Sequence, residues 1–311
     1  MTTQNGYHEV ICSHLYQNGY LKGMYADLIV RMQYQPLGQD TKKTAVDGIM
    51  FKLHRIIAIR SPFLQGLLQD QELNSEYQPT SQLTIVTHDK NLTPAGLGVA
   101  FGHLYASYSQ HLLAQDMPLD ERQNETRSTL LCSVLSAANL LQLHDLAQLT
   151  TEYIKQSMSR DTVIQYCGFL QESGHQQQEL KDAVFTYLCR GVVLETLENV
   201  GLIWGCEDGK GFAALVKLFV ELPFEWLKNV IESKYFEVPS DMERFSFAKA
   251  VIEQRKAVNG VAPVEENVLL TFGGKRQSGV TVVRKSKSVS QIALIPNGTN
   301  GERRIWKAGQ V

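Results

Sequence analysis

The sequence predicts an α+β N-terminal domain, in which a small sheet packs with helices, followed by an all-α domain and a mostly disordered basic tail. Three observations predict this order. Three short strand-like runs lie among helical segments in the first part of the chain. Apolar residues then recur at helical spacing as far as residue 256. From Asn259 onward Gly, Pro, Ser, Asn and basic residues dominate, which is typical of disorder.

The first element expected is a helix over residues 8–22, which ends at Asn18-Gly19. Strands follow at Ala26–Met32 and Ile49–Leu53, joined by a long polar hairpin loop with Pro and Gly. The third strand is Leu83–Val86. These three strands make the small sheet.

The stretch from Phe51 to Leu68 joins the second strand to two short helices. Its apolar residues first alternate, which suits a strand, and then cluster in threes and fours, which suits helices. Ser61-Pro62 interrupts the run where a helix begins, because Ser caps free N–H groups and Pro fits the first helical position.

Pro94 begins a helix that continues to about Ser107 and contains three glycines, Gly96, Gly98 and Gly102. A dinucleotide-binding loop is excluded, because the spacing differs from the required pattern and no strand leads directly into it. Close approach of a neighbouring helix explains the glycines instead. The later helices are expected at Thr129–Leu143, Leu146–Met158, Thr162–Ser173, Glu179–Val193, Leu215–Lys234 and Met242–Lys256.

The composition is that of an ordinary globular protein, with 311 residues, 43% hydrophobic and 20% charged. No run of eighteen apolar residues and no signal-peptide pattern occurs, so no membrane span is expected. The five cysteines include no Cys-x-x-Cys pair, which favours reduced thiols and a place in the cytoplasm or nucleus.

The charge is unevenly distributed. Lys275–Val311 contains eight Lys/Arg and one acid, whereas the other 274 residues contain 22 Lys/Arg and 31 acids. A basic tail can contact nucleic acid, a membrane or an acidic partner, and charge alone does not choose among them, although nucleic acid is not the partner we favour. Ser286, Ser288 and Ser290 lie beside basic residues and are candidate phosphorylation sites, with a plain solvated linker as the alternative.

No enzyme motif is complete. Gly205–Gly211 resembles a phosphate-binding loop, but it is one residue short between glycines and has Gly211 where Ser or Thr must bind Mg²⁺. The eight histidines show no zinc spacing, and no Gly-x-Ser-x-Gly occurs. His54 is expected to be a hydrogen-bonded structural residue. We therefore expect no catalytic residue, no cofactor and no metal.

Three motifs resemble the BTB/POZ domain. They are the aspartate-led strand Asp27–Val30, the junction Phe51–Arg55 and the helix start Arg60–Leu64. Val99–Tyr105 is similar to the germ-cell-less branch of that family, and Leu222–Lys228 and Val238–Phe245 resemble its BACK region. The resemblance implies a BTB/POZ domain over 1–158, a BACK-like domain over 159–257 and a flexible basic tail over 258–311.

The resemblance also implies a homodimer. The N-terminal helix would contact the partner protomer through Val10, Ile11, Leu15 and Tyr16, with Asp27 close to the interface and paired to a basic group. The alternative is a helix folded onto its own domain.

BTB–cullin binding would use the helix that begins at Pro94, through Val99, His103 and Tyr108. The hydrophobic-x-Glu signature of known adaptors is missing there, which weakens that interpretation. The implied function is a non-enzymatic adaptor, a dimeric substrate receptor of a cullin–RING ubiquitin ligase. A self-associating scaffold or transcriptional cofactor is the alternative. The protein substrate stays open, as does an extension beyond Val311, because the sequence has no recognisable terminal element there.

Overall fold

The computed structural model describes residues 3–35, 49–74, 81–106, 127–172, 177–205, 209–259, 264–270 and 279–286. The N-terminal part contains a small sheet and its helices. Its elements are α1 (Thr3–His14), the π-helix η1 (Leu15–Leu21), β1 (Leu28–Tyr34), β2 (Ile49–Leu53), α2 (Arg55–Ala58), α3 (Pro62–Asn74), β3 (Ser81–Thr87) and α4 (Pro94–Tyr105).

The sheet has the strand order β2-β1-β3, with β1 antiparallel to β2 and parallel to β3. Alternate residues of β1, namely Leu28, Val30 and Met32, are buried, which follows from the two-residue period of a strand. The three strands predicted from the sequence are confirmed, although β1 begins at Leu28 and β3 begins at Ser81. The structure describes no part of the loop 36–48.

The strand–helix–cap–helix order of Phe51–Leu68 is also confirmed. Ser61 Oγ accepts a hydrogen bond from the Leu64 N–H at 3.3 Å, as an N-terminal cap does. The same hydroxyl donates to the Leu141 carbonyl at 2.7 Å. One buried side chain therefore begins α3 and also fixes it to the turn after α6.

Helix α4 lies at the centre of the N-terminal part, and its glycines allow close packing. A Cβ atom at Gly96 would lie 2.0 Å from Ser133 Oγ, on α6 (Arg127–Leu140). A Cβ at Gly102 would meet the ring of Tyr16 at 3.0 Å. The expectation that these glycines serve close approach rather than nucleotide binding is therefore confirmed for Gly96 and Gly102.

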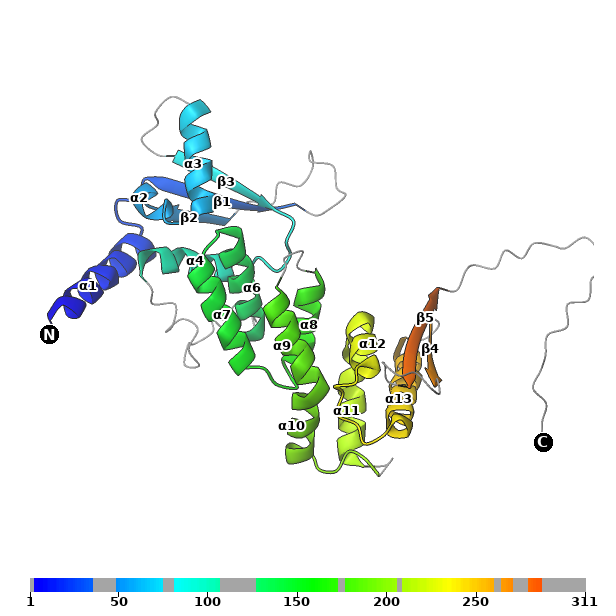
Figure 1. The fold of residues 1–311 in the computed structure, drawn as a ribbon. Helices are drawn as coiled ribbons and strands as arrows, with labels where there is room; N and C mark the ends of the chain where they lie inside the picture. Colours follow the sequence, from blue (N-terminus) through cyan, green and yellow to red (C-terminus); the bar gives the residue numbers. More distant parts are fainter. Residues whose placement is uncertain are drawn as a thin grey trace, which may run out of the picture.

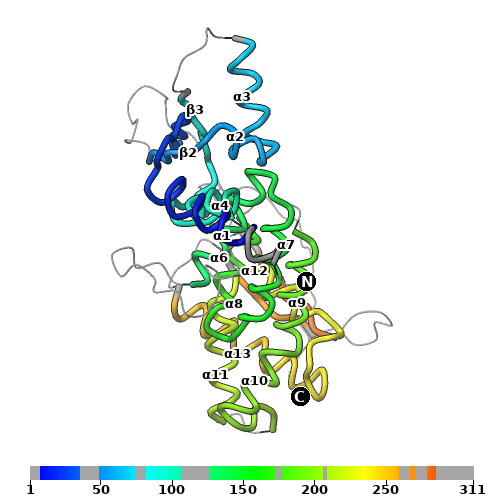
Figure 2. Tube along the Cα trace, turned by 90° about the vertical axis from the view of Figure 1, so that its left-hand side faces the viewer, coloured from blue at the N-terminus to red at the C-terminus, as the bar shows by residue number. Residues whose placement is uncertain are grey.

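The helical half extends away from the sheet, with α10 and α11 at the far end (Figures 1 and 2). One continuous apolar core runs from the sheet into these helices. The elements are α6, α7 (His144–Gln156), α8 (Val163–Glu172), α9 (Gln178–Thr186), the π-helix η3 (Tyr187–Gly191), α10 (Val192–Asn199), α11 (Lys210–Glu221), α12 (Phe224–Glu232) and α13 (Asp241–Asn259).

Two expectations need correction. The N-terminal helix does not end at Asn18-Gly19, because η1 continues through Leu21. The segment after Asn259 is not wholly flexible either, since β4 (Val264–Leu270) and β5 (Val280–Ser286) form an antiparallel hairpin. Val280 and Val282 are buried against the helices, and their β-branched side chains offset the polar, basic composition that predicted disorder.

Candidate protein-interaction surfaces

The N-terminal helix exposes apolar side chains. Val10 is 67% exposed, and Ile11, Leu15 and Leu21 are exposed as well. Figure 1 shows α1 pointing away from the rest of the molecule, and its main neighbour among the described elements is η1. An apolar surface on a projecting helix is typical of a contact site for another chain.

Two tyrosines fix the base of this helix to α4. Tyr16 and Tyr20 have ring centroids 5.6 Å apart and lie over Gly102. The Tyr20 hydroxyl donates to the Gly98 carbonyl at 2.6 Å. Burial raises the pKa of both hydroxyls, so both stay neutral and keep these contacts at ordinary pH. Tyr16 is therefore half-buried within its own chain, unlike the exposed residues before it.

The junction after β2 is a hydrogen-bonded structural site. The Asp27 carboxylate accepts from the Arg55 N–H at 2.8 Å and so caps α2, which is a backbone contact rather than the predicted ion pair. His54 Nδ1 lies 2.8 Å from the Tyr105 hydroxyl, and its Nε2 lies 2.8 Å from the Met24 carbonyl. Because a carbonyl only accepts, Nε2 donates to it and Nδ1 accepts from Tyr105. The structural role expected for His54 is confirmed.

Strand β2 is an edge strand, because β1 is its only partner in the described part of the sheet. Ile49 and Met50 on this strand are exposed. The row of backbone N–H and C=O groups along such an edge can pair with a strand from another chain. The N-terminal part therefore has two surfaces suited to a protein partner, the helix and the sheet edge.

Helix α4 does not present the exposed edge that the sequence predicted. His103 is only 7% exposed, and its Nε2 lies 2.9 Å from Asp145 Oδ2 at the start of α7. Burial would raise the pKa of Asp145, but the hydrogen bond and charge of His103 lower it below the usual value. Val99 is half-buried against the core, and Tyr108 lies outside the described residues. The expectation of an exposed His103 is wrong, because its ring is buried and its Nε2 contacts Asp145.

The tail serines lie at or beyond the end of the hairpin. Ser286 is the last residue of β5, whereas Ser288 and Ser290 lie outside the described residues. The hairpin is held by Glu266, which receives hydrogen bonds from Arg255 at 2.9 Å and Arg284 at 2.6 Å. Glu266 was not among the residues predicted from the sequence, although an acid beside an apolar run was the available signal.

Metal-binding clusters and membrane-spanning helices are two other classes of feature. Among the described residues no cluster of three or more His, Cys, Asp or Glu side chains could hold a metal ion. In the same part of the chain, no helix is both long and apolar enough to cross a bilayer. Neither finding adds a site to the surfaces above.

The chain resembles a curated protein over nearly its whole length. It is 22% identical over 306 residues to BTB/POZ domain-containing protein 2 of Schizosaccharomyces pombe, covering 97% of this chain and 92% of that protein. This similarity supports a BTB/POZ relationship. No family model matches the chain. A mixed fold with a small sheet and many helices is compatible with a BTB domain followed by a helical region. A BTB/POZ relative suggests a non-enzymatic protein-interaction adaptor.

Proposed function

We propose that the protein is a non-enzymatic adaptor that forms a homodimer through α1 and η1. The observation that carries this proposal is the exposed apolar surface of Val10, Ile11 and Leu15 on a projecting helix. Fully burying such a side chain stabilises an interface by about 1.5–3 kcal/mol. A second copy of the chain is the natural partner, because BTB domains generally self-associate.

The exposed edge of β2 supports the same proposal. A partner helix on α1 and a partner strand on β2 would cover the exposed apolar side chains of these two elements. Asp27 lies beside this region but is already bound to the Arg55 N–H. It contributes to the proposed dimer by holding α2 in place rather than by direct pairing.

Light scattering after gel filtration tests the dimer. Val10→Asp should lower the measured mass from dimer to monomer, because it places a charge in an apolar interface. Leu73→Asp is the matched control, since Leu73 on α3 is also exposed and the substitution is the same. The proposal would be wrong if the native chain were monomeric at micromolar concentration. It would also be wrong if both variants lost the dimer to the same extent.

The adaptor is further proposed to bind a cullin and to present a protein substrate to its RING ligase. In that role it acts by raising the effective concentration of the substrate near the ligase. Capture of the purified chain by a cullin N-terminal domain is the direct test. No capture at tens of micromolar would argue against this role and leave the dimer proposal standing.

A self-associating scaffold or transcriptional cofactor without a cullin is the second candidate. It is favoured by the burial of α4, where His103 is buried and Val99 is half-buried. The missing hydrophobic-x-Glu signature points the same way. Ser286, Ser288 and Ser290 remain proposed modification sites, which phosphoproteomic mapping of the intact chain would test.

A further inference from the structure

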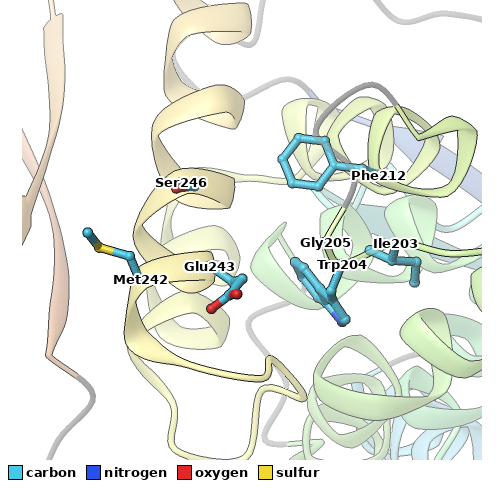
Figure 3. Close-up of a pocket in the computed structure, with 7 residues that line it drawn as sticks. All are labelled: Ile203, Trp204, Gly205, Phe212, Met242, Glu243 and Ser246. Carbon is cyan, nitrogen blue, oxygen red and sulfur yellow. The ribbon is translucent and has the colours of Figure 1, made fainter.

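A pocket of about 300 Å³ lies between the start of α13 and the chain segment that leads into α11. Its lining residues are Ile203, Trp204, Gly205, Phe212, Met242, Glu243 and Ser246. Figure 3 shows the rings of Trp204 and Phe212 on one side and the Glu243 carboxylate on the other, extending from α13. This volume is at the lower limit for small-molecule sites and suits one long side chain.

The aromatic wall of the pocket is held by the core behind it. The Trp204 ring packs edge-on against Phe247, with centroids 5.8 Å apart and an interplanar angle of 79°. Phe212 packs against the same ring at 5.9 Å. Phe247 is fully buried, so both pocket rings rest on a fixed support. The wall therefore loses little freedom when a ligand binds, which favours affinity.

The backbone beneath Trp204 is also fixed. Gly201 and Gly205 have φ angles of +110° and +83°, which glycine adopts readily and other residues rarely do. A Cβ at Gly211 would lie 2.5 Å from the Gly201 carbonyl oxygen, so α11 packs directly on this segment. The glycines that resembled a phosphate loop in the sequence thus shape the side of a pocket.

Among the described residues that line the pocket, Glu243 is the one with a charged side chain. The Ser240 hydroxyl donates to its Oε2, and the Glu243 N–H donates to Ser240 Oγ at 3.4 Å, so Ser240 caps the start of α13 and also holds the Glu243 side chain. No basic side chain among the described residues forms an ion pair with Glu243. Nearby Asp241, by contrast, is paired with Arg244 at 3.6 Å.

We propose that this pocket binds a lysine or arginine side chain of a partner protein. The aromatic faces of Trp204 and Phe212 would cover the aliphatic stem and attract the cation, and Glu243 would receive its N–H groups. Met242 is 65% exposed at the rim and adds adaptable apolar contact. This inference rests on the proposed adaptor function, because it assigns the helical half a site for the protein that the adaptor holds.

Fluorine NMR of the full chain labelled with 5-fluorotryptophan tests the pocket directly. The chain has three tryptophans, and a Trp204→Phe variant assigns the relevant resonance. Trp226 is an internal control, since its Nε1 donates to the Cys167 carbonyl at 3.2 Å and it does not line the pocket. The probes are N-acetyl-arginine methylamide and its neutral isostere, N-acetyl-citrulline methylamide.

The arginine probe should shift the Trp204 resonance saturably and leave Trp226 in place, while the citrulline probe should not. Glu243→Gln can keep the hydrogen bond from the Ser240 hydroxyl, because the Gln amide oxygen also accepts, and should weaken binding by about fivefold through loss of the charge. Glu253→Gln removes the same charge elsewhere on α13, where Glu253 is exposed beside Lys249, and should leave binding unchanged.

Equal binding of both probes, no saturable shift, or unchanged affinity in Glu243→Gln would each overturn the proposal. Equal binding would assign the pocket to neutral side chains instead. None of these outcomes would contradict the adaptor proposal. A chain that dimerises normally but ignores the arginine probe keeps the adaptor function and loses only this pocket.

Discussion

Two hydrogen atoms at Gly96 decide how closely α4 and α6 can pack. A Cβ there would lie 2.6 Å from the backbone carbon of Ser133, and backbone cannot move aside cheaply. The Ser133 hydroxyl also forms a hydrogen bond with Thr93 Oγ1, 2.8 Å away, at the cap of α4. Gly96 and Ser133 therefore fix the start of α4 against the middle of α6.

Gly96→Ala should therefore destabilise the protein by about 1–3 kcal/mol through overpacking. Gly98→Ala is the control on the same helix, because its nearest neighbour would be Tyr20 Oη at an ordinary 3.6 Å. Alanine there should be neutral or stabilising by up to about 1 kcal/mol, since it suits a helix better than glycine. Urea unfolding of both variants measures the difference. Equal free energies of unfolding would show that α6 yields to the added methyl group.

Tyr105 links α4 to the junction after β2. Its hydroxyl accepts from the His54 N–H at 2.9 Å and donates to His54 Nδ1. Burial raises the pKa of Tyr105 to about 12, and the charge of Asp27 adds to this rise against the opposing effect of the His54 N–H. The neutral phenol is therefore the form that the fold favours.

Tyr105→Phe should cost roughly 1–2 kcal/mol near neutral pH, because His54 loses two hydrogen bonds in a largely buried place. The pH dependence has a definite sign. A raised pKa in the folded state gives stability that is complete below pH 10 and is lost as the pH rises towards 12. The variant should lose less stability than the native chain across that range. Parallel alkaline unfolding curves would contradict this assignment.

Among the elements, the β4–β5 hairpin is held by charge as well as by its two buried valines. Arg255 is buried and also donates to the carbonyls of Val220 and Leu222, each at 2.7 Å, where α11 ends. Arg284 lies over the Phe224 ring at 3.9 Å. The hairpin thus connects α11, α12 and α13, through Glu266 at the centre of this network.

Glu266→Gln should destabilise the hairpin by roughly 2 kcal/mol or more, because it leaves Arg255 buried without its counter-charge. Burial alone would raise the pKa of Glu266, but hydrogen bonds and charge from Arg255 and Arg284 lower it below its ordinary value. The stabilisation is therefore present above about pH 4.5 and is lost as the pH falls through the folded-state pKa.

Hydrogen exchange of the β4 and β5 amides measures this effect. Exchange should quicken in Glu266→Gln at pH 7, and the difference from the native chain should shrink under acid conditions. Glu253→Gln is the control, because the exposed pair with Lys249 is worth little. Unchanged exchange in Glu266→Gln would mean that Val280 and Val282 hold the hairpin without the charges.

At the scale of the whole molecule, local patterns predicted the elements, and contacts between distant segments decided their roles. The alternation and cap in Phe51–Leu68 were sufficient for the strand and two helices, because each signal is short-range. The prediction for His103 was wrong because its burial and its hydrogen bond to Asp145, 42 residues later in the chain, depend on tertiary packing. The hairpin was missed because Arg255, which pairs with Glu266, and the helices that bury Val280 and Val282 lie in earlier segments of the chain.

The two segments that the sequence predicts as domains, residues 1–158 and 159–257, share one core. Gln165 of α8 hydrogen-bonds to Ser128 and Thr129 of α6, and Tyr166 and Cys167 beside it are fully buried. The boundary near residue 158 therefore separates two chain segments without separating two cores. Cooperative unfolding depends on such shared burial more than on chain topology.

The whole chain should consequently unfold in one transition that includes both the sheet and the distal helices. Native-state hydrogen exchange in increasing denaturant tests this, because amides of β1 and of α12 should reach the same opening free energy and the same denaturant slope. Trp204 and Trp226 lie in the helical half, so their fluorescence alone would not report on β1. If β1 opened at a denaturant concentration where α12 stayed protected, the contacts made by Gln165 and Tyr166 would join two independently stable domains.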